Sequence, residues 1–214
     1  MRVGFFTILI GLLAFAGCTS GDSSSTAGGS GGTAGTGGAG GSGGSGGTVF
    51  TWPPDATVYI DTHGIFHADC ETDEDCAMAL GYYHARDRFV QMDLQRRLST
   101  GRLAEVVNKP VVESAGLLEP LLETATENRA LYSTRDGRPA EEVLLETTDA
   151  RSLRLYEAYA VGVNQWISDV QNGENGAVWP REFQSPVLDY GPEDALEWKP
   201  SDSLATVFTL IGSL

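Results

Sequence analysis

The chain has 214 residues, with 29 acidic and 14 basic side chains and a formal net charge of −15. Because neutralising a phosphate backbone needs clustered lysine and arginine, this charge excludes a general nucleic-acid binder. It indicates an acidic, well-solvated surface and says little about a substrate.

The first residues have the form of an export signal. Arg2 precedes an apolar run, and small residues then lead to Cys18. The run is shorter than the about 20 apolar residues of a membrane-spanning helix, so we interpret residues 1–17 as a signal peptide. Ala16-Gly17-Cys18 resembles a bacterial lipobox, which predicts cleavage before Cys18 and a lipid on its sulfur. We therefore expect an exported protein that is lipid-anchored to the cell envelope, at the outer membrane or the periplasmic face. Ordinary signal cleavage beside an incidental cysteine is the alternative.

Residues 18–48 are almost wholly Gly, Ser, Thr and Ala after the cysteine. This composition cannot bury a core, so it predicts a disordered tether. Residues 49–214 remain, which are enough for one domain or most of one.

Two further cysteines, Cys70 and Cys76, lie in this region. An exported protein favours their pairing, and their spacing is not that of a zinc site. The sequence therefore predicts a local disulfide, with two buried free thiols as the alternative.

The folded region opens with a strand candidate at 58–60, a turn at 61–64 and a return strand at 65–68. His63 and His67 are the obvious candidates for chemistry in this segment. Four residues apart in a hairpin, they do not share a helix face, so we interpret them as structural histidines.

A long helix is predicted from Thr72 to about Thr100, because Thr72 and Asp75 resemble a capping box and an apolar stripe follows. A short helix at 102–107 should follow it and end at Asn108 and Pro110. Four charged residues lie among bulky apolar ones in the long helix, and their setting favours a structural ion network over an active site: Arg86, Asp87, Arg88 and Asp93.

Further along, residues 113–130 are predicted to be mostly helical, with a break or kink at Pro120. A polar loop at 133–139 and one or two helices at 141–169 should follow, with one apolar face. Residues 178–200 are predicted to be irregular. A final apolar helix starts near Ser201-Asp202, and its unterminated pattern leads us to expect that the natural polypeptide continues past Leu214.

No nucleophile elbow, phosphate loop or cluster of metal ligands is legible. The residues alone therefore disclose no reaction.

Several blocks do resemble the penicillin acylase family of N-terminal nucleophile hydrolases. Residues 58–68 resemble its opening strand and turn, and 81–92 resemble its G-Y-x-x-A-Q-D-R-L-F-Q-M block. Residues 96–105 resemble R-R-x-x-x-G-x-L-A-E, and 159–167 resemble Y-A-x-G-[MV]-N-x-W-I. Two landmarks near Trp179 and Trp198 follow, and all blocks keep the family order.

The resemblance implies an α+β fold, namely the α-chain part of a four-layer αββα sandwich, mostly helical in this fragment. It implies a secreted amidohydrolase of the penicillin or acyl-homoserine-lactone acylase type, acting on a small-molecule amide. The nucleophile would be the N-terminal serine of a β chain, activated by its own α-amino group. That serine is expected beyond residue 214, so 49–214 would be an α-chain region truncated at its C-terminus.

No catalytic, cofactor-binding or metal-binding residue of this fragment is assigned by the resemblance; calcium is possible in the full-length protein. The β chain of the same precursor is the expected partner. Apolar side chains such as Tyr156, Tyr159 and Trp166, and the final helix, would pack against it. The alternative is a non-catalytic, surface-tethered binding lipoprotein that reuses the α-chain fold.

Overall fold

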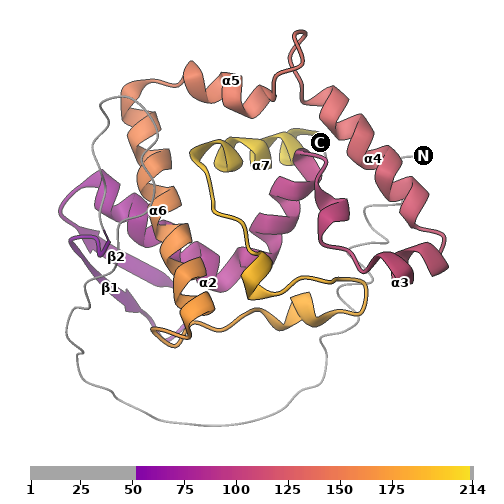
Figure 1. Cartoon of the computed structure of the whole chain (residues 1–214). Coiled ribbons are helices and arrows are strands. Elements are labelled where there is room, and N and C mark those ends of the chain that lie inside the picture. The colour runs from indigo at the N-terminus through magenta and orange to yellow at the C-terminus, as the bar shows by residue number, and fades with distance from the viewer. Residues whose placement is uncertain (1–51, 213–214) are drawn as a thin grey trace. The chain divides into compact units, whose positions relative to one another are not determined.

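The computed structural model describes residues 52–212, with side chains described for 52–208. The predicted signal peptide, the tether and Cys18 lie outside these residues. The elements, in chain order, are β1 (Ala56–Ile60), β2 (Phe66–Cys70), α2 (Asp73–Ser99), α3 (Lys109–Ser114), α4 (Leu118–Leu131), α5 (Ala140–Glu146), α6 (Ala150–Asn172) and α7 (Pro200–Gly212) (Figure 1). Short 3-10 turns lie at Leu103–Glu105, Arg181–Gln184 and Pro192–Asp194.

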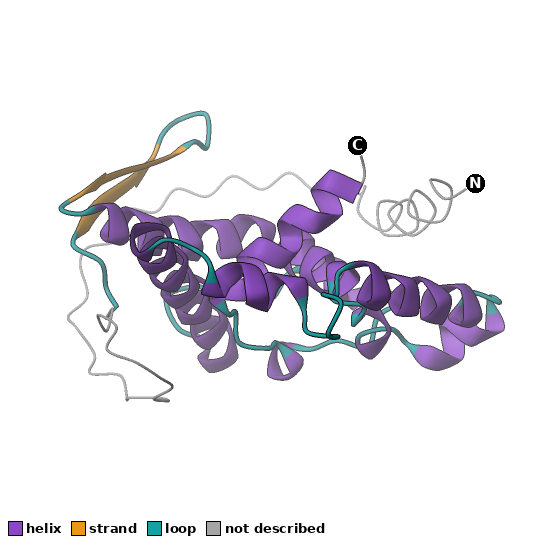
Figure 2. Cartoon of the chain, turned by 90° about the horizontal axis from the view of Figure 1, so that it is seen from above, coloured by secondary structure: helices purple, strands orange, loops and turns teal. Residues whose placement is uncertain are grey.

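The strands form the predicted hairpin. They pair antiparallel, with Val58 opposite Ala68, and they make a two-stranded sheet. Asp61 shapes the turn, since its Oδ1 accepts hydrogen bonds from the N–H groups of His63 and Ile65. Gly64 has a φ of +79°, a conformation that glycine adopts readily. Figure 2 shows the hairpin at one end of an otherwise helical fragment.

Helix α2 begins and ends where its sequence signals predict. The Thr72 side chain accepts a hydrogen bond from the N–H of Asp75, and Gly101, with a φ of +64°, follows the helix end. Asp75 takes part in this cap with its side chain as well. The Asp75 carboxylate accepts from the Thr72 hydroxyl and from the N–H of Asp55, so the cap also fastens the segment before β1.

Two predicted helix stops are wrong. Residues 102–107 form only a 3-10 turn, and Asn108 then begins α3, where its side chain accepts from the N–H of Val111. Pro110 lies in the first turn of α3, and Pro120 lies in the first turn of α4. Because first-turn N–H groups have no partner within a helix, proline is tolerated there. The chain changes direction instead at Gly116, whose φ is +70°.

Helices α2 and α6 form the core of the fragment. The predicted helical region at 141–169 is two helices, α5 and α6; the Asp149 side chain caps α6, and Gly173 ends it. The Phe89 and Trp166 rings meet at 4.8 Å between α2 and α6. Trp166 is only 1% exposed, so the expectation that it faces a β chain is wrong.

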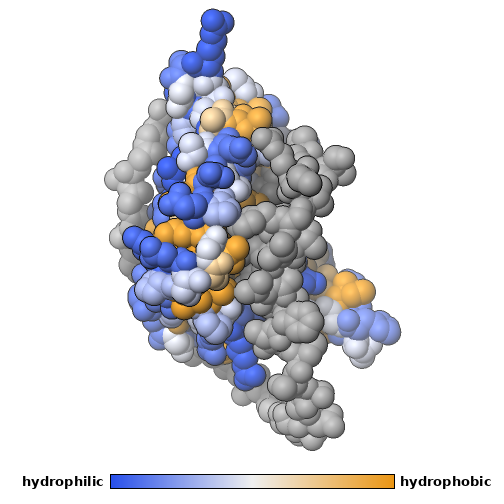
Figure 3. All heavy atoms as spheres, turned by 90° about the vertical axis from the view of Figure 1, so that its right-hand side faces the viewer, coloured by the Kyte–Doolittle hydropathy of each residue, from blue (hydrophilic) through white to orange (hydrophobic). Residues whose placement is uncertain are grey.

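Some apolar surface remains open. The face shown in Figure 3 carries apolar patches among hydrophilic side chains. Leu131 of α4 is 70% exposed and Val207 of α7 is 44% exposed. Within residues 52–212, no helix is both long and apolar enough to cross a membrane.

Candidate functional site

A buried charge network connects α2 to the start of α7. The Asp93 carboxylate is fully buried and accepts from Arg96 Nε at 2.7 Å and from Arg97 Nε at 2.8 Å. Arg96 also donates to Asp202 in α7 at 2.9 Å and to the carbonyl oxygens of Leu196 and Glu197. The network therefore holds the chain that leads into α7 against the middle of the fragment.

Arg97 extends the network in a second direction. It donates to Glu105 at 3.0 Å and to the Tyr190 hydroxyl at 3.3 Å, and it lies over the Tyr190 ring. Burial raises the pKa of Tyr190 to about 12, and the Asp93 charge acts in the same direction. A neutral phenol at this position suits its role as an acceptor for Arg97.

The predicted structural ion pairing is confirmed for Asp93, and Arg86 and Asp87 form a separate ion pair with each other. Arg86 pairs with its neighbour Asp87 at the surface, at 2.7 Å and 3.0 Å, and Arg88 is exposed. The true partners, Arg96 and Arg97, stand three and four residues after Asp93. That spacing places all three side chains on one face of a helix, so their pairing could have been predicted from the sequence.

The histidines do not form a catalytic or metal site. His63 is exposed, and His67 Nε2 lies 3.2 Å from Asp61. The Ile65 N–H, together with His67, lowers the pKa of the Asp61 carboxyl. His84 Nδ1 lies 3.2 Å from the Tyr159 hydroxyl. Residues 52–212 contain no group of three His, Cys, Asp or Glu side chains placed to hold a metal ion, so calcium remains an expectation for other parts of the protein.

The predicted disulfide is present. It joins Cys70 at the end of β2 to Cys76 in the first turn of α2, with the two Cα atoms 5.5 Å apart. It therefore fastens the hairpin to the longest helix.

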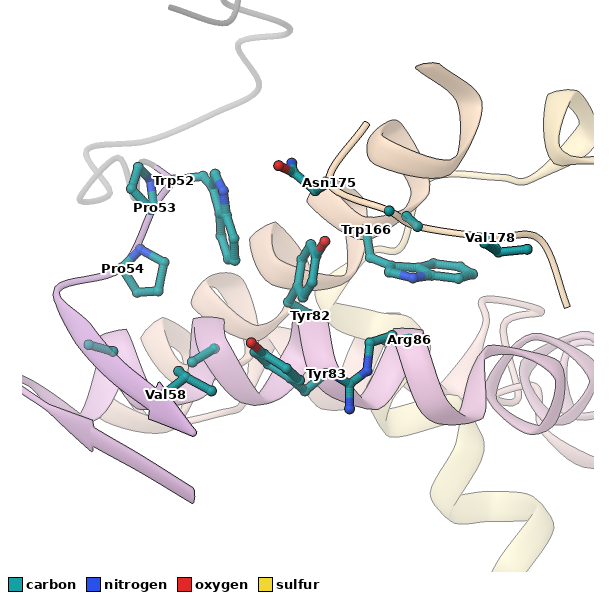
Figure 4. Close-up of a pocket in the computed structure, with 14 residues that line it drawn as sticks. Trp52, Pro53, Pro54, Val58, Tyr82, Tyr83, Arg86, Trp166, Asn175 and Val178 are labelled. Carbon is teal, nitrogen blue, oxygen red and sulfur yellow. The ribbon is translucent and has the colours of Figure 1, made fainter. Parts of the chain in front are cut away.

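A hollow of about 550 Å3 lies between the segment before β1, helix α2 and the end of α6 (Figure 4). Trp52 stacks on Tyr82 with ring centroids 4.9 Å apart, and the Arg86 guanidinium lies 4.5 Å above the Tyr83 ring. Trp166 forms another part of the wall.

Asp169 lies behind this hollow and is fully buried. Its carboxylate accepts from the Tyr82 hydroxyl at 2.7 Å, from Gln165 at 2.7 Å and from Asn175 at 2.9 Å. Burial, and then the hydrogen bond to Asp169, raise the pKa of Tyr82 well above its usual value. Tyr82 therefore stays a neutral donor that fixes this wall of the hollow.

A second hollow, of about 640 Å3, lies where α2 ends, beside α4, α5 and the start of α7. It is lined by charges of both signs, including Arg102, Arg129, Glu141 and Lys199. Burial raises the pKa of Glu141. Because the lining carries both cations and carboxylates, it suits a polar interface more than a selective anion or cation site.

The described residues position no nucleophile. The hydrogen-bonded histidines contact Asp61 and the Tyr159 phenol, so neither is placed as a base for a serine or threonine hydroxyl or for a thiol, and Cys70 and Cys76 are joined. The described residues form a buried ion network, a disulfide-linked hairpin and two hollows.

Comparison with known proteins identifies the fold and the family of this chain. The fold is similar to that of a thermostable penicillin G acylase from Alcaligenes faecalis, with a TM-score of 0.59, 20% sequence identity, and coverage of 76% of this chain and 73% of that chain. The family model described as penicillin amidase matches residues 55–214. The chain belongs to the penicillin amidase family, a family of amide-hydrolysing acylases, which confirms the resemblance of its sequence blocks.

Two curated relatives support the same family assignment. The chain is 32% identical over 148 residues to the acyl-homoserine lactone acylase QuiP of Pseudomonas aeruginosa, and 30% identical over 147 residues to the penicillin acylase 2 proenzyme of a Pseudomonas species. In each case 69% of this chain is matched. The matched part spans only 14% and 16% of the length of these relatives.

Proposed function

We propose that this chain is the α-chain portion of an exported acylase that hydrolyses a non-peptide linear amide of a small molecule. The family match over residues 55–214 supports the class of reaction, and the relatives are named as acylases of penicillin and of acyl-homoserine lactones. One relative is named a proenzyme, which fits a precursor that is processed into two chains.

The proposed nucleophile is the N-terminal serine of a β chain from the same precursor. Its oxygen attacks the amide carbonyl carbon while its hydroxyl proton passes to its own α-amino group, and that proton then leaves with the amine. Water hydrolyses the resulting ester, which releases the acid and regenerates the serine. Hydrogen-bond donors of the β chain would stabilise the oxyanion.

The role of this chain in that reaction is to hold α7 in place. The Asp93 network is the observation that supports this role. Arg96 joins α2 to Asp202 in the first turn of α7 and to two carbonyl oxygens just before it. A buried ion pair with Asp93 and a partly buried one with Asp202 therefore meet at one side chain. Such a rigid connection suits α7 if this helix is to pack against the β chain.

The test compares the 214-residue chain with the complete precursor encoded by its gene. Each is assayed on chromogenic phenylacetyl and long-acyl amides. We expect no turnover by the 214-residue chain, and turnover by the precursor after it cleaves itself. Changing the new N-terminal serine to alanine should abolish it. A complete protein that neither cleaves itself nor hydrolyses any of these amides would support a surface-tethered binding lipoprotein instead.

We also propose that the protein is anchored through Cys18. The support is the sequence alone: Arg2, the apolar run and Ala16-Gly17-Cys18. One acyl chain binds a membrane only marginally, so a stable anchor needs more than one. Mass spectrometry of the membrane fraction should find a mature N-terminus at Cys18 that carries diacylglycerol. An unmodified N-terminus beyond Cys18 would refute the anchor.

A further inference from the structure

The chain contains two Asn-Gly pairs close together, and they lie in different backbone settings. Asn172-Gly173 forms the end of α6, and Asn175-Gly176 lies in the turn that follows. All four residues are exposed. An asparagine side chain reacts most readily with the next backbone nitrogen when that nitrogen belongs to glycine, because glycine has no Cβ to hinder the approach. In a folded chain, the reaction also requires that the glycine N–H is not already held.

The end of α6 holds Gly173. Its N–H donates to the carbonyl oxygens of Asp169 and Val170. The following N–H, that of Glu174, donates to the Asp169 carbonyl oxygen at 2.8 Å. Attack by the Gly173 nitrogen would break this helix end, so Asn172 can react only after local opening of the structure.

Gly176 is not held in this way. Within residues 52–212, its N–H has no hydrogen-bond acceptor. The Asn175 side chain does make a contact, since its Nδ2 donates to the Asp169 carboxylate at 2.9 Å. That contact engages the nitrogen that would leave and not the backbone nitrogen that would attack. As the leaving nitrogen takes up a proton, the Asp169 carboxylate stabilises its positive charge.

We propose that Asn175 is a site of spontaneous deamidation in the folded chain and that Asn172 is protected. The Gly176 nitrogen gives its proton to water and bonds to Asn175 Cγ, which forms a succinimide ring. The bond between Cγ and Nδ2 breaks, and this nitrogen takes up a proton and leaves as ammonia. Water then opens the ring at Cγ, which yields aspartate, or at the main-chain carbon of Asn175, which yields isoaspartate.

The product places a second carboxylate beside Asp169, which is fully buried. A carboxylate cannot donate a hydrogen bond, so Asp169 keeps its donors Tyr82 and Gln165 and meets a like charge in place of the amide. Residues 175–178 line the 550 Å3 hollow (Figure 4). We therefore expect deamidation to detach this turn from α6 and to loosen that wall of the hollow.

This modification goes beyond the proposed acylase activity, and either can fail while the other stands. Peptide mapping of the purified 214-residue chain, incubated at mildly alkaline pH, tests it. Cleavage after glutamate places Asn172 in residues 158–174 and Asn175 in residues 175–182, so the two are measured on separate peptides. Mass spectrometry then follows the replacement of NH2 by OH in each peptide, and fragment ions distinguish Asn172 from Asn164.

We expect Asn175 to convert at least about tenfold faster than Asn172 in the folded chain, because only Asn172 needs local opening. The matched control is the same chain unfolded in guanidinium chloride, where both asparagines should convert at similar rates. Equal rates in the folded chain would overturn the proposed site. A difference that persists in the unfolded chain would also overturn it, because the fold would then not be the cause.

Two variants test the effect on Asp169. Asn175→Asp and Asn175→Gly both remove the amide donor, and both residue types tolerate the φ of 49° at this position. Only the Asp variant adds a charge beside Asp169, so it should unfold at a lower urea concentration than the Gly variant at neutral pH. Equal urea midpoints would overturn the proposed detachment of the turn.

Discussion

Gly81 of α2 and Gly162 of α6 mark the place where the two longest helices meet backbone to backbone. A Cβ atom on Gly81 would lie closer than 3.0 Å to the carbonyl oxygen of Tyr159, and one on Gly162 would lie 2.8 Å from the Tyr82 nitrogen. Backbone atoms cannot move aside as the end of a flexible side chain can. Both glycines are therefore required by packing and not by an unusual φ angle.

We predict that Gly81→Ala and Gly162→Ala each lower the free energy of unfolding by about 1–3 kcal/mol, because overpacking forces the helices apart. Alanine's helix propensity, about 1 kcal/mol better than that of glycine, offsets part of a larger steric cost. Urea unfolding followed by circular dichroism measures the difference. Gln91→Ala, at an exposed position of α2, is the control and should change stability by less than about 0.5 kcal/mol. If the Gly81 and Gly162 variants are as stable as this control, α2 and α6 do not need backbone contact at this crossing.

The two aspartates of α2 should respond very differently to the loss of their charge. Asp93→Asn leaves the buried guanidinium groups of Arg96 and Arg97 without their shared counterion, and we expect a loss of about 3–5 kcal/mol. Asp87→Asn breaks an exposed pair with Arg86 and should cost about 0–1 kcal/mol. Denaturant titration of both variants gives the comparison. Similar losses of unfolding free energy in the two variants would show that the Asp93 network is not important for the stability of the fold.

The sequence predicted the elements whose signals are local. The hairpin predicted at 58–68 forms at 56–70, and both ends of α2 follow from turn residues, a cap and apolar periodicity. Pro110 and Pro120 were misinterpreted because proline is disfavoured inside a helix but tolerated in its first turn. Whether a proline lies inside a helix or in its first turn depends on where the helix starts, and the tertiary structure determines that position.

The candidate site was harder to predict because its parts are distant in the chain. The Arg96 partner Asp202 is 106 residues away, and its two carbonyl partners belong to a segment without regular structure. The hollow joins residues near 52, near 82 and near 175. The aromatic pattern of α6 showed that Trp166 lies on an apolar face, but not that Phe89 of α2 covers it.

The Cys70–Cys76 disulfide should contribute to stability through the unfolded chain. Closing a seven-residue loop corresponds to about 2 kcal/mol in the chain-entropy model. We expect the double variant Cys70→Ser/Cys76→Ser to melt about 4–8 °C lower, given the usual relation between stability and melting temperature for a chain of this size. Dithiothreitol should lower the melting temperature of the unaltered protein by a similar amount and leave the double variant unchanged. Free, alkylatable thiols at both positions without reductant would refute the bond.

His84 should make stability depend on pH. Although His84 is an exposed residue, partial burial of its imidazole lowers the pKa from 6.5, and the Asp87 charge opposes this shift only in part. The unfolded chain therefore binds a proton at a higher pH than the folded chain does. Where the unfolded state binds more protons, stability rises with pH, so this contribution is complete well above pH 6.5 and declines as the pH falls through that value.

The measurement is the urea midpoint between about pH 5 and pH 7.5. His84→Asn keeps an acceptor for the Tyr159 hydroxyl but cannot titrate, so it should flatten the decline toward pH 5. His63→Asn, at an exposed position in the hairpin turn, is the matched control for removing a histidine and should keep the slope of the unaltered protein. Other carboxylates also titrate near pH 5, which is why the difference between the two variants decides the question and not the slope of either alone. Identical slopes in both variants would mean that the contact between His84 and Tyr159 does not shield the imidazole from water.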